Sequence, residues 1–134
     1  MKVLALAIAL LALAAPVAYA QDEPPKLKGT LSYARTGGIA GVSDSFKIKR
    51  TGKARLNGRS FRLRKVEREA IAELLVKVDL GKLKVKAKEP VADAFNHSLR
   101  YRGKSIAYDD PSTPKKLKKL TKLLGRLIAK YDDN

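Results

Sequence analysis

The residues that could carry out acid–base or metal chemistry are few in this sequence. It contains one histidine, His97, and no cysteine. Cysteine–histidine catalysis is therefore excluded, and one chain cannot supply two histidines to a zinc ion. A Ser-His-Asp arrangement through His97 stays open, but Phe95, His97, Leu99 and Tyr101 occupy alternate positions. This period of two favours a histidine that packs on one face of a strand.

The acidic pairs give little support for catalysis. Asp109-Asp110 falls in a predicted loop and Asp132-Asp133 in the C-terminal tail. Adjacent acidic residues in such segments are usually solvated charges, and the spacing of a calcium-binding loop is absent. We therefore expect a protein that is not an enzyme, with no catalytic residue, no metal site and no cofactor.

A glycine-rich segment is the next candidate for function. Residues 36–41 read TGGIAG, with an isoleucine among glycines where a linker would normally carry polar residues. The simplest interpretation is a tight connection between two strands, in which glycine supplies permissive backbone angles. The alternative is a loop that presents one apolar anchor to a partner's pocket. The candidate contact residues are Gly37, Gly38, Ile39, Ala40 and Gly41.

The C-terminal segment offers a third candidate, a basic surface opposite a stripe of leucines. Such a helix could lie on an anionic membrane or follow an anionic polymer. The other interpretation is that the leucines complete the core of a small domain, which needs the apolar area, and that the cations are solvated. Nucleic-acid binding is not expected, because the few aromatic residues fall at inward strand positions. The candidate electrostatic surface comprises Lys115, Lys116, Lys118, Lys119, Lys122 and Arg126.

The N-terminus predicts export. Residues 1–20 combine Lys2, an apolar run and the sequence Ala18-Tyr19-Ala20, which is typical of a signal peptide cleaved after Ala20. No later segment approaches the roughly 20 apolar residues of a membrane span. Export without cysteine favours a bacterial periplasmic or secreted protein.

Beyond the signal peptide the chain is short and strongly basic. The whole sequence of 134 residues carries a formal charge of +16, and loss of Lys2 leaves +15. Such a charge favours anionic partners without choosing among them. We expect a flexible lead-in over 21–26, one domain over 27–131, a tail over 132–134, and a monomer when free.

Periodicity predicts the elements of this domain. Alternation from residue 27 to 33 and from 44 to 63, with Thr-Gly and Asn-Gly turns, predicts a strand followed by two hairpins. Residues 65–81 have helical spacing from Val66 to Val78, and residues 95–109 predict another hairpin. The segment Lys82–Lys88 is either an edge strand or an extended loop.

The last helix is expected to begin with Thr113 as its N-cap and Pro114 at its first position. The order of elements predicts a single small α+β domain, in which a mostly antiparallel sheet of four to six strands carries two helices on one face. The sheet residues expected in the core are Phe46, Ile48, Phe61, Leu63, Leu99 and Ile106. The helix residues expected to cover them are Ile71, Leu74, Leu75, Leu120, Leu124 and Leu127.

The sequence also resembles a known family. The stretches YARTGGIAGVSDSFKI, FRLRKVEREAIAELL and VADAFNHSLRYRGKSI are similar to emfourin, the protein inhibitor of protealysin, and to its secreted relatives. The similarity runs from about Leu31 to Ile128 and is sharpest over Gly37 to Gly41, with support from Asp93 and Tyr101. The chain differs from emfourin itself in its predicted signal peptide and its higher positive charge.

This resemblance implies inhibition of thermolysin-like zinc metallopeptidases by a protein that contains no metal. Because such enzymes cleave on the amino side of bulky apolar residues, we expect Ile39 to occupy the apolar subsite and the Gly38 carbonyl to face the enzyme's zinc. A scaffold that holds the loop would resist cleavage. The alternative function is a basic extracytoplasmic module that binds anionic polymers or membrane surfaces through the last helix.

Overall fold

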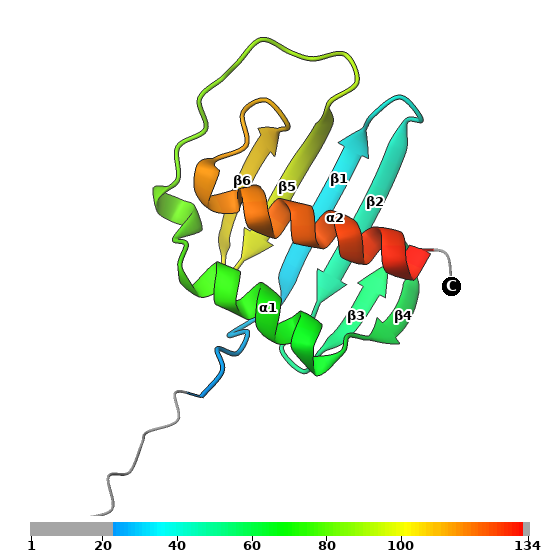
Figure 1. The fold of residues 1–134 in the computed structure, drawn as a ribbon, viewed down its shortest axis with the longest axis vertical. Helices are drawn as coiled ribbons and strands as arrows, with labels where there is room; N and C mark the ends of the chain where they lie inside the picture. Colours follow the sequence, from blue (N-terminus) through cyan, green and yellow to red (C-terminus); the bar gives the residue numbers. More distant parts are fainter. Residues whose placement is uncertain (1–22, 133–134) are drawn as a thin grey trace, which may run out of the picture.

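The computed structural model describes residues 23–132. They form one antiparallel sheet of six strands in the order β4-β3-β2-β1-β5-β6, with α1 and α2 across one face (Figure 1). The predicted α+β fold is thus confirmed. The strands are β1 (Leu31–Gly37), β2 (Val42–Ile48), β3 (Lys53–Leu56), β4 (Arg59–Arg62), β5 (Phe95–Tyr101) and β6 (Lys104–Asp109). The helices are α1 (Lys65–Val76) and α2 (Lys118–Asp132), with short 3₁₀ turns η1 (Leu80–Lys82) and η2 (Lys115–Leu117).

Two predictions concern the ends of the chain, which lie outside the described residues. The predicted signal peptide, residues 1–20, and the last two residues of the predicted tail lie outside the described residues. Within residues 23–132, neither helix has the length and apolar character needed to cross a membrane.

Two of the predicted hairpin turns share one backbone conformation, which the sequence Asn-Gly predicts for the first of them. Asn57 and Gly58 have φ of 50° and 86°, and Arg102 and Gly103 have φ of 53° and 75°. Positive φ at both central residues defines a type I′ turn, whose twist matches that of the flanking strands. These turns join β3 to β4 and β5 to β6, so local chemistry sets both registers.

The core lies between the sheet and the two helices. Alternate strand residues point towards the helices, and the leucine stripe of α2 covers them with α1. Ten of the twelve residues expected in this core are buried in it, and Phe61 and Leu74 are partly buried and pack against it. The buried members are Phe46, Ile48, Leu63, Ile71, Leu75, Leu99, Ile106, Leu120, Leu124 and Leu127.

The predicted boundaries of the helices need correction. The hydroxyl of Thr113 donates to the carbonyls of Asp109 and Asp110, so it does not cap a helix. Pro114 precedes the 3₁₀ turn η2, and α2 itself begins at Lys118. Val66, expected on the apolar side of the first helix, is 68% exposed because it lies in the first turn, away from the core.

Two extended segments also differ from a simple strand interpretation. The segment Lys82–Lys88 contains no strand; η1 ends at Lys82 and irregular chain follows to Ala94. The first strand begins at Leu31, so the alternation that started at Leu27 extends beyond the paired region. Leu27 is nevertheless buried in the core.

Candidate functional site

The glycine-rich segment is the turn between β1 and β2, at the end of the sheet where the irregular chain enters β5 (Figure 1). Ile39 at its tip is 88% exposed, the largest exposure among the big apolar side chains of the described residues. The amide of Gly41 donates to the carbonyl of Gly38 at 3.2 Å, which closes the turn. We call residues Gly37–Gly41 the β1–β2 loop.

The first two glycines of the β1–β2 loop are required by close packing as well as by backbone angle. Gly37 and Gly38 have φ of 107° and 76°, where other L-residues are strained. A Cβ atom on Gly37 would lie 2.8 Å from the Ala94 carbonyl oxygen, and one on Gly38 would lie 2.8 Å from the Phe95 ring. The loop therefore packs against the start of β5, and the Gly38 amide donates to Ala94 at 3.4 Å.

An ion pair lies beneath the β1–β2 loop. Arg35 of β1 contacts Asp44 of β2 at 2.9 Å, and Asp44 is only 7% exposed. Asn57 donates to the other Asp44 oxygen at 2.9 Å. The Arg35 guanidinium also lies 4.8 Å from the centre of the Phe95 ring, within the range of a cation–π contact. These contacts join β1, β2, β5 and the β3–β4 turn, so they brace the loop from below.

The single histidine, His97, lies among the residues that support the β1–β2 loop from below. The two ring nitrogens of His97 lie 2.7 Å from the Tyr33 hydroxyl and 2.5 Å from an Asp110 oxygen. The other Asp110 oxygen accepts from the Phe95 amide at 2.8 Å. Burial raises the pKa of Tyr33 above its ordinary value, so its hydroxyl stays protonated. Both ring nitrogens are thus engaged by residues other than serine, and His97 is a buried strand residue as predicted.

A second exposed apolar residue lies beside the β1–β2 loop. Val91 is 57% exposed, and its carbonyl accepts from the amide of Ala94, whose own carbonyl accepts from Gly38. Asp93, one of the residues that carry the similarity to emfourin, is exposed in the same turn. Sequence reasoning did not select Val91, because a single valine in an irregular segment has no periodic signal.

The basic residues of the last helix form a face that is exposed to solvent. Lys115, Lys116, Lys118, Lys119, Lys122 and Arg126 are all exposed. The leucines on the other side of α2 are in the core, as the second interpretation of this helix predicted. The cations therefore remain available for contact, whereas the apolar stripe does not.

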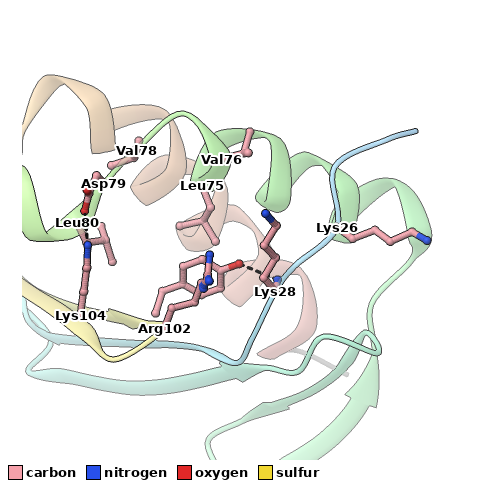
Figure 2. Close-up of a pocket in the computed structure, with 10 residues that line it drawn as sticks. Lys26, Lys28, Leu75, Val76, Val78, Asp79, Leu80, Arg102 and Lys104 are labelled. Carbon is pink, nitrogen blue, oxygen red and sulfur yellow. Dashed lines mark hydrogen bonds and ion pairs between the residues drawn. The ribbon is translucent and has the colours of Figure 1, made fainter. Parts of the chain in front are cut away.

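A separate pocket of about 400 Å³ lies at the opposite end of the sheet (Figure 2). Its walls come from the N-terminal segment, the end of α1 with η1, and the β5–β6 turn. Lys104 contacts Asp79 at 2.9 Å, and this hydrogen bond lowers the pKa of the Asp79 carboxyl. Lys26 points away from the cavity in Figure 2. Because β1 begins at this end and the β1–β2 loop is at the other, the pocket is no part of the loop site.

The described residues thus define a small α+β domain that presents a braced loop with an apolar tip. Across residues 23–132 no three His, Cys, Asp or Glu side chains are grouped to hold a metal ion. Compared with known protein families, curated proteins and solved structures, the chain matches none of them.

Proposed function

We propose that this protein is an exported inhibitor of thermolysin-like zinc metallopeptidases, and that the β1–β2 loop enters the enzyme's cleft. One observation carries the proposal: Ile39 is 88% exposed at the tip of a loop whose first two glycines, Gly37 and Gly38, pack tightly on the start of β5. A bulky apolar side chain presented on a stiff turn suits an apolar subsite. The resemblance to emfourin supplies the class of target enzyme.

The backbone around Ile39 suits a substrate-like pose. The Gly38 carbonyl accepts one hydrogen bond, from Gly41, and a carbonyl oxygen has two lone pairs. Its second lone pair can therefore face the zinc ion of the enzyme while Ile39 fills the subsite on the other side of that peptide bond. The inhibitor itself needs no metal or cofactor for this contact.

The strand pairing explains why such a loop would resist cleavage. Gly37 pairs with Val42 in the β1–β2 ladder, so the two chain ends on either side of the loop are held by the sheet. Phe95 packs against Gly38 from β5. A cut at Gly38-Ile39 would leave both new ends in place, which favours religation and slows release. This is preorganisation acting as inhibition.

Val91 supports a contact surface wider than one residue. It is the second exposed apolar side chain at this end of the sheet, and hydrogen bonds through Ala94 connect its turn to the β1–β2 loop. A peptidase cleft binds residues on both sides of the scissile bond. The loop and the Val91 turn would together cover more of the cleft than Ile39 alone.

The alternative function is electrostatic binding of an anionic polymer or membrane surface through α2. Its support is the row of six exposed cations on η2 and α2. Because the leucines of α2 are buried, this contact would rest on charge alone and would weaken steeply with salt. Export through a signal peptide cleaved after Ala20 would place either function in the periplasm or outside the cell.

Titration of the purified protein into a panel of thermolysin-like peptidases, at low and high salt, tests the proposal. We expect stoichiometric inhibition of at least one enzyme, with a dissociation constant that changes little between the two salt concentrations. A loop anchor buried in a cleft is screened much less than surface charges. Failure of micromolar protein to inhibit any member of the panel would exclude this function.

A further inference from the structure

The face of the sheet away from the helices carries a dense group of cations. Both helices cover one face only, so the other face is open (Figure 1). Over β2, β3 and β4 this open face is hollowed into a shallow groove of about 650 Å³. The groove is lined in part by Lys47, Lys49, Lys53, Arg55 and Arg62, which we call the sheet cations.

The register of the strands places sheet cations directly opposite one another. Lys47 of β2 pairs with Arg55 of β3, and Lys53 of β3 pairs with Arg62 of β4. Like charges at directly opposite positions destabilise an antiparallel pair. Within the described residues, no ion pair includes a sheet cation. The fold therefore bears an unfavourable charge arrangement that an anionic ligand would relieve.

Protection of a sheet edge does not account for this arrangement. Lysine and arginine often discourage unwanted pairing on edge strands, and Arg62 lies on the edge strand β4. Lys47, however, lies on β2, which has β1 on one side and β3 on the other. An edge needs no cation at that position.

Small hydroxyl residues lie among the sheet cations. Ser32 is opposite Lys47, and Ser60 is opposite Arg55. From β1 to β4 along this row, the side chains therefore run hydroxyl, cation, cation, hydroxyl. Neighbouring strands are about 4.8 Å apart, so this row offers anion contacts and neutral hydrogen bonds within one short span.

The same face lacks the features that nucleic acids and bilayers require. Strand aromatics such as Tyr33 and Phe46 pack on the covered face. Phe61 borders the groove, but its ring stacks on Phe46 and Tyr131, so the described strands offer no free ring to stack on a base. The exposed large apolar residues of the described chain lie in loops and on α1, so none can insert into a bilayer from this face. Charge and hydroxyl groups remain as the available contacts.

We propose that the sheet cations form a binding site for an acidic polysaccharide. Its carboxylate or sulfate groups would bridge Lys47 with Arg55 and Lys53 with Arg62, and its sugar hydroxyls would contact Ser32 and Ser60. The site is on the opposite face of the sheet from α2 and does not use the β1–β2 loop. It would hold an exported inhibitor on an acidic cell-surface or matrix polymer.

The test uses labelled heparin as a sulfated polysaccharide probe, with affinity measured by fluorescence anisotropy at several salt concentrations. The variant Lys47→Gln/Arg55→Gln should bind at least about tenfold more weakly, and the slope of log affinity against log salt should fall by about two. Its thermal midpoint should stay equal or rise, because a like-charge pair has been removed. A preserved midpoint separates loss of the site from loss of the fold.

The matched control is Lys119→Gln/Lys122→Gln, which removes the same charge from the exposed face of α2. It should change heparin affinity by less than about threefold. An equal loss in both variants would show that net charge alone governs binding and would overturn the site. Duplex DNA and phosphatidylglycerol vesicles serve as competing probes: tighter binding of either than of heparin, lost in the sheet variant, would overturn the choice of partner.

Discussion

The β1–β2 loop and helix α2 differ in where their apolar residues lie relative to the core. In α2 the leucines pack into or against the core, and the cations face solvent. In the loop Ile39 is exposed, while the polar and charged support beneath it, including Asp44 and Arg35, is mostly covered. The apolar residues of the helix therefore stabilise the fold. The apolar side chain of the loop does not, and it is available to a binding partner.

Local geometry explains this difference. A helix presents residues three and four apart on one side, so α2 can bury one complete stripe against the sheet. A tight turn between two strands cannot turn one side towards the sheet in this way, so Ile39 at its tip points away from the core. The exposure is structural in origin, and only a partner can relieve it.

Substitution of Ile39 by aspartate should cause the largest loss of inhibition. An aspartate would have to be desolvated in an apolar subsite, which costs about 3 kcal/mol or more and weakens inhibition at least roughly a hundredfold. Because Ile39 has almost no contact with the domain, the thermal midpoint should not change. Inhibition constants and melting curves for the two proteins measure both effects.

The matched surface control is Lys119→Glu on α2. A rim charge mainly affects the association rate and its salt dependence, so the inhibition constant should change by less than about threefold. If Lys119→Glu abolished inhibition and Ile39→Asp did not, the contact surface would lie on α2 and the comparison of the two regions would be reversed.

Two alanine substitutions within the loop should separate packing from backbone strain. Gly38 and Gly41 both have positive φ, so alanine at either position costs about 1–2 kcal/mol. Only at Gly38 would the new methyl group strike the Phe95 ring; at Gly41 nothing lies within 4 Å. Gly38→Ala should therefore be less stable than Gly41→Ala by a further 1–3 kcal/mol or so, and its inhibition about tenfold weaker. Equal melting points would show that Phe95 does not brace the loop.

Much of the fold follows from local signals in the sequence. Asn57-Gly58 specifies a type I′ turn, and period-two alternation identifies the buried faces of β2 and β5. The leucines of α2 have helical spacing that predicts their burial. Each of these signals depends on residues close together in the chain, so it can be recognised from the sequence alone.

The support of the candidate site could not be predicted in this way. The contacts of Phe95 with Gly38 and with Arg35 depend on which distant strand pairs with β1. That neighbour is β5, which is distant in sequence. The predicted start of the last helix is wrong for a related reason: the Thr113 hydroxyl donates to carbonyls of the preceding turn, so it is unavailable as a cap.

Val91 gives a smaller test of how far the contact surface extends. If the Val91 turn lies on the enzyme, Val91→Asp should weaken inhibition by roughly tenfold at unchanged stability, because the residue is already exposed and would be buried only in the complex. Val66→Asp is the matched control, since Val66 is at least as exposed, at 68% against 57%, but lies on α1. Equal inhibition by both variants would restrict the surface to the β1–β2 loop.

The smallest effect on inhibition is expected at Glu67, which joins the two helices. Its carboxylate accepts from Lys130 at 2.8 Å, from Tyr131 at 2.5 Å and from the Arg64 amide at 3.0 Å. Burial opposes its ionisation, but the hydrogen bonds from Lys130, Tyr131 and Arg64 outweigh burial and lower the pKa of Glu67.

Because the folded pKa of Glu67 is below the unfolded value, its stabilisation is present above the unfolded pKa of about 4.3 and is lost as pH falls through the folded pKa. Glu67→Gln should therefore lower the free energy of unfolding by about 1–2 kcal/mol at pH 7 and by much less at pH 2–3, in melts at both pH values. Inhibition at pH 7 should be unchanged, because Glu67 braces α1 and α2 and makes no contact with the loop. A variant that melts earlier yet inhibits normally would show that the helices supply the fold while the loop supplies the contact; a parallel loss of inhibition would show that the loop depends on the helix layer.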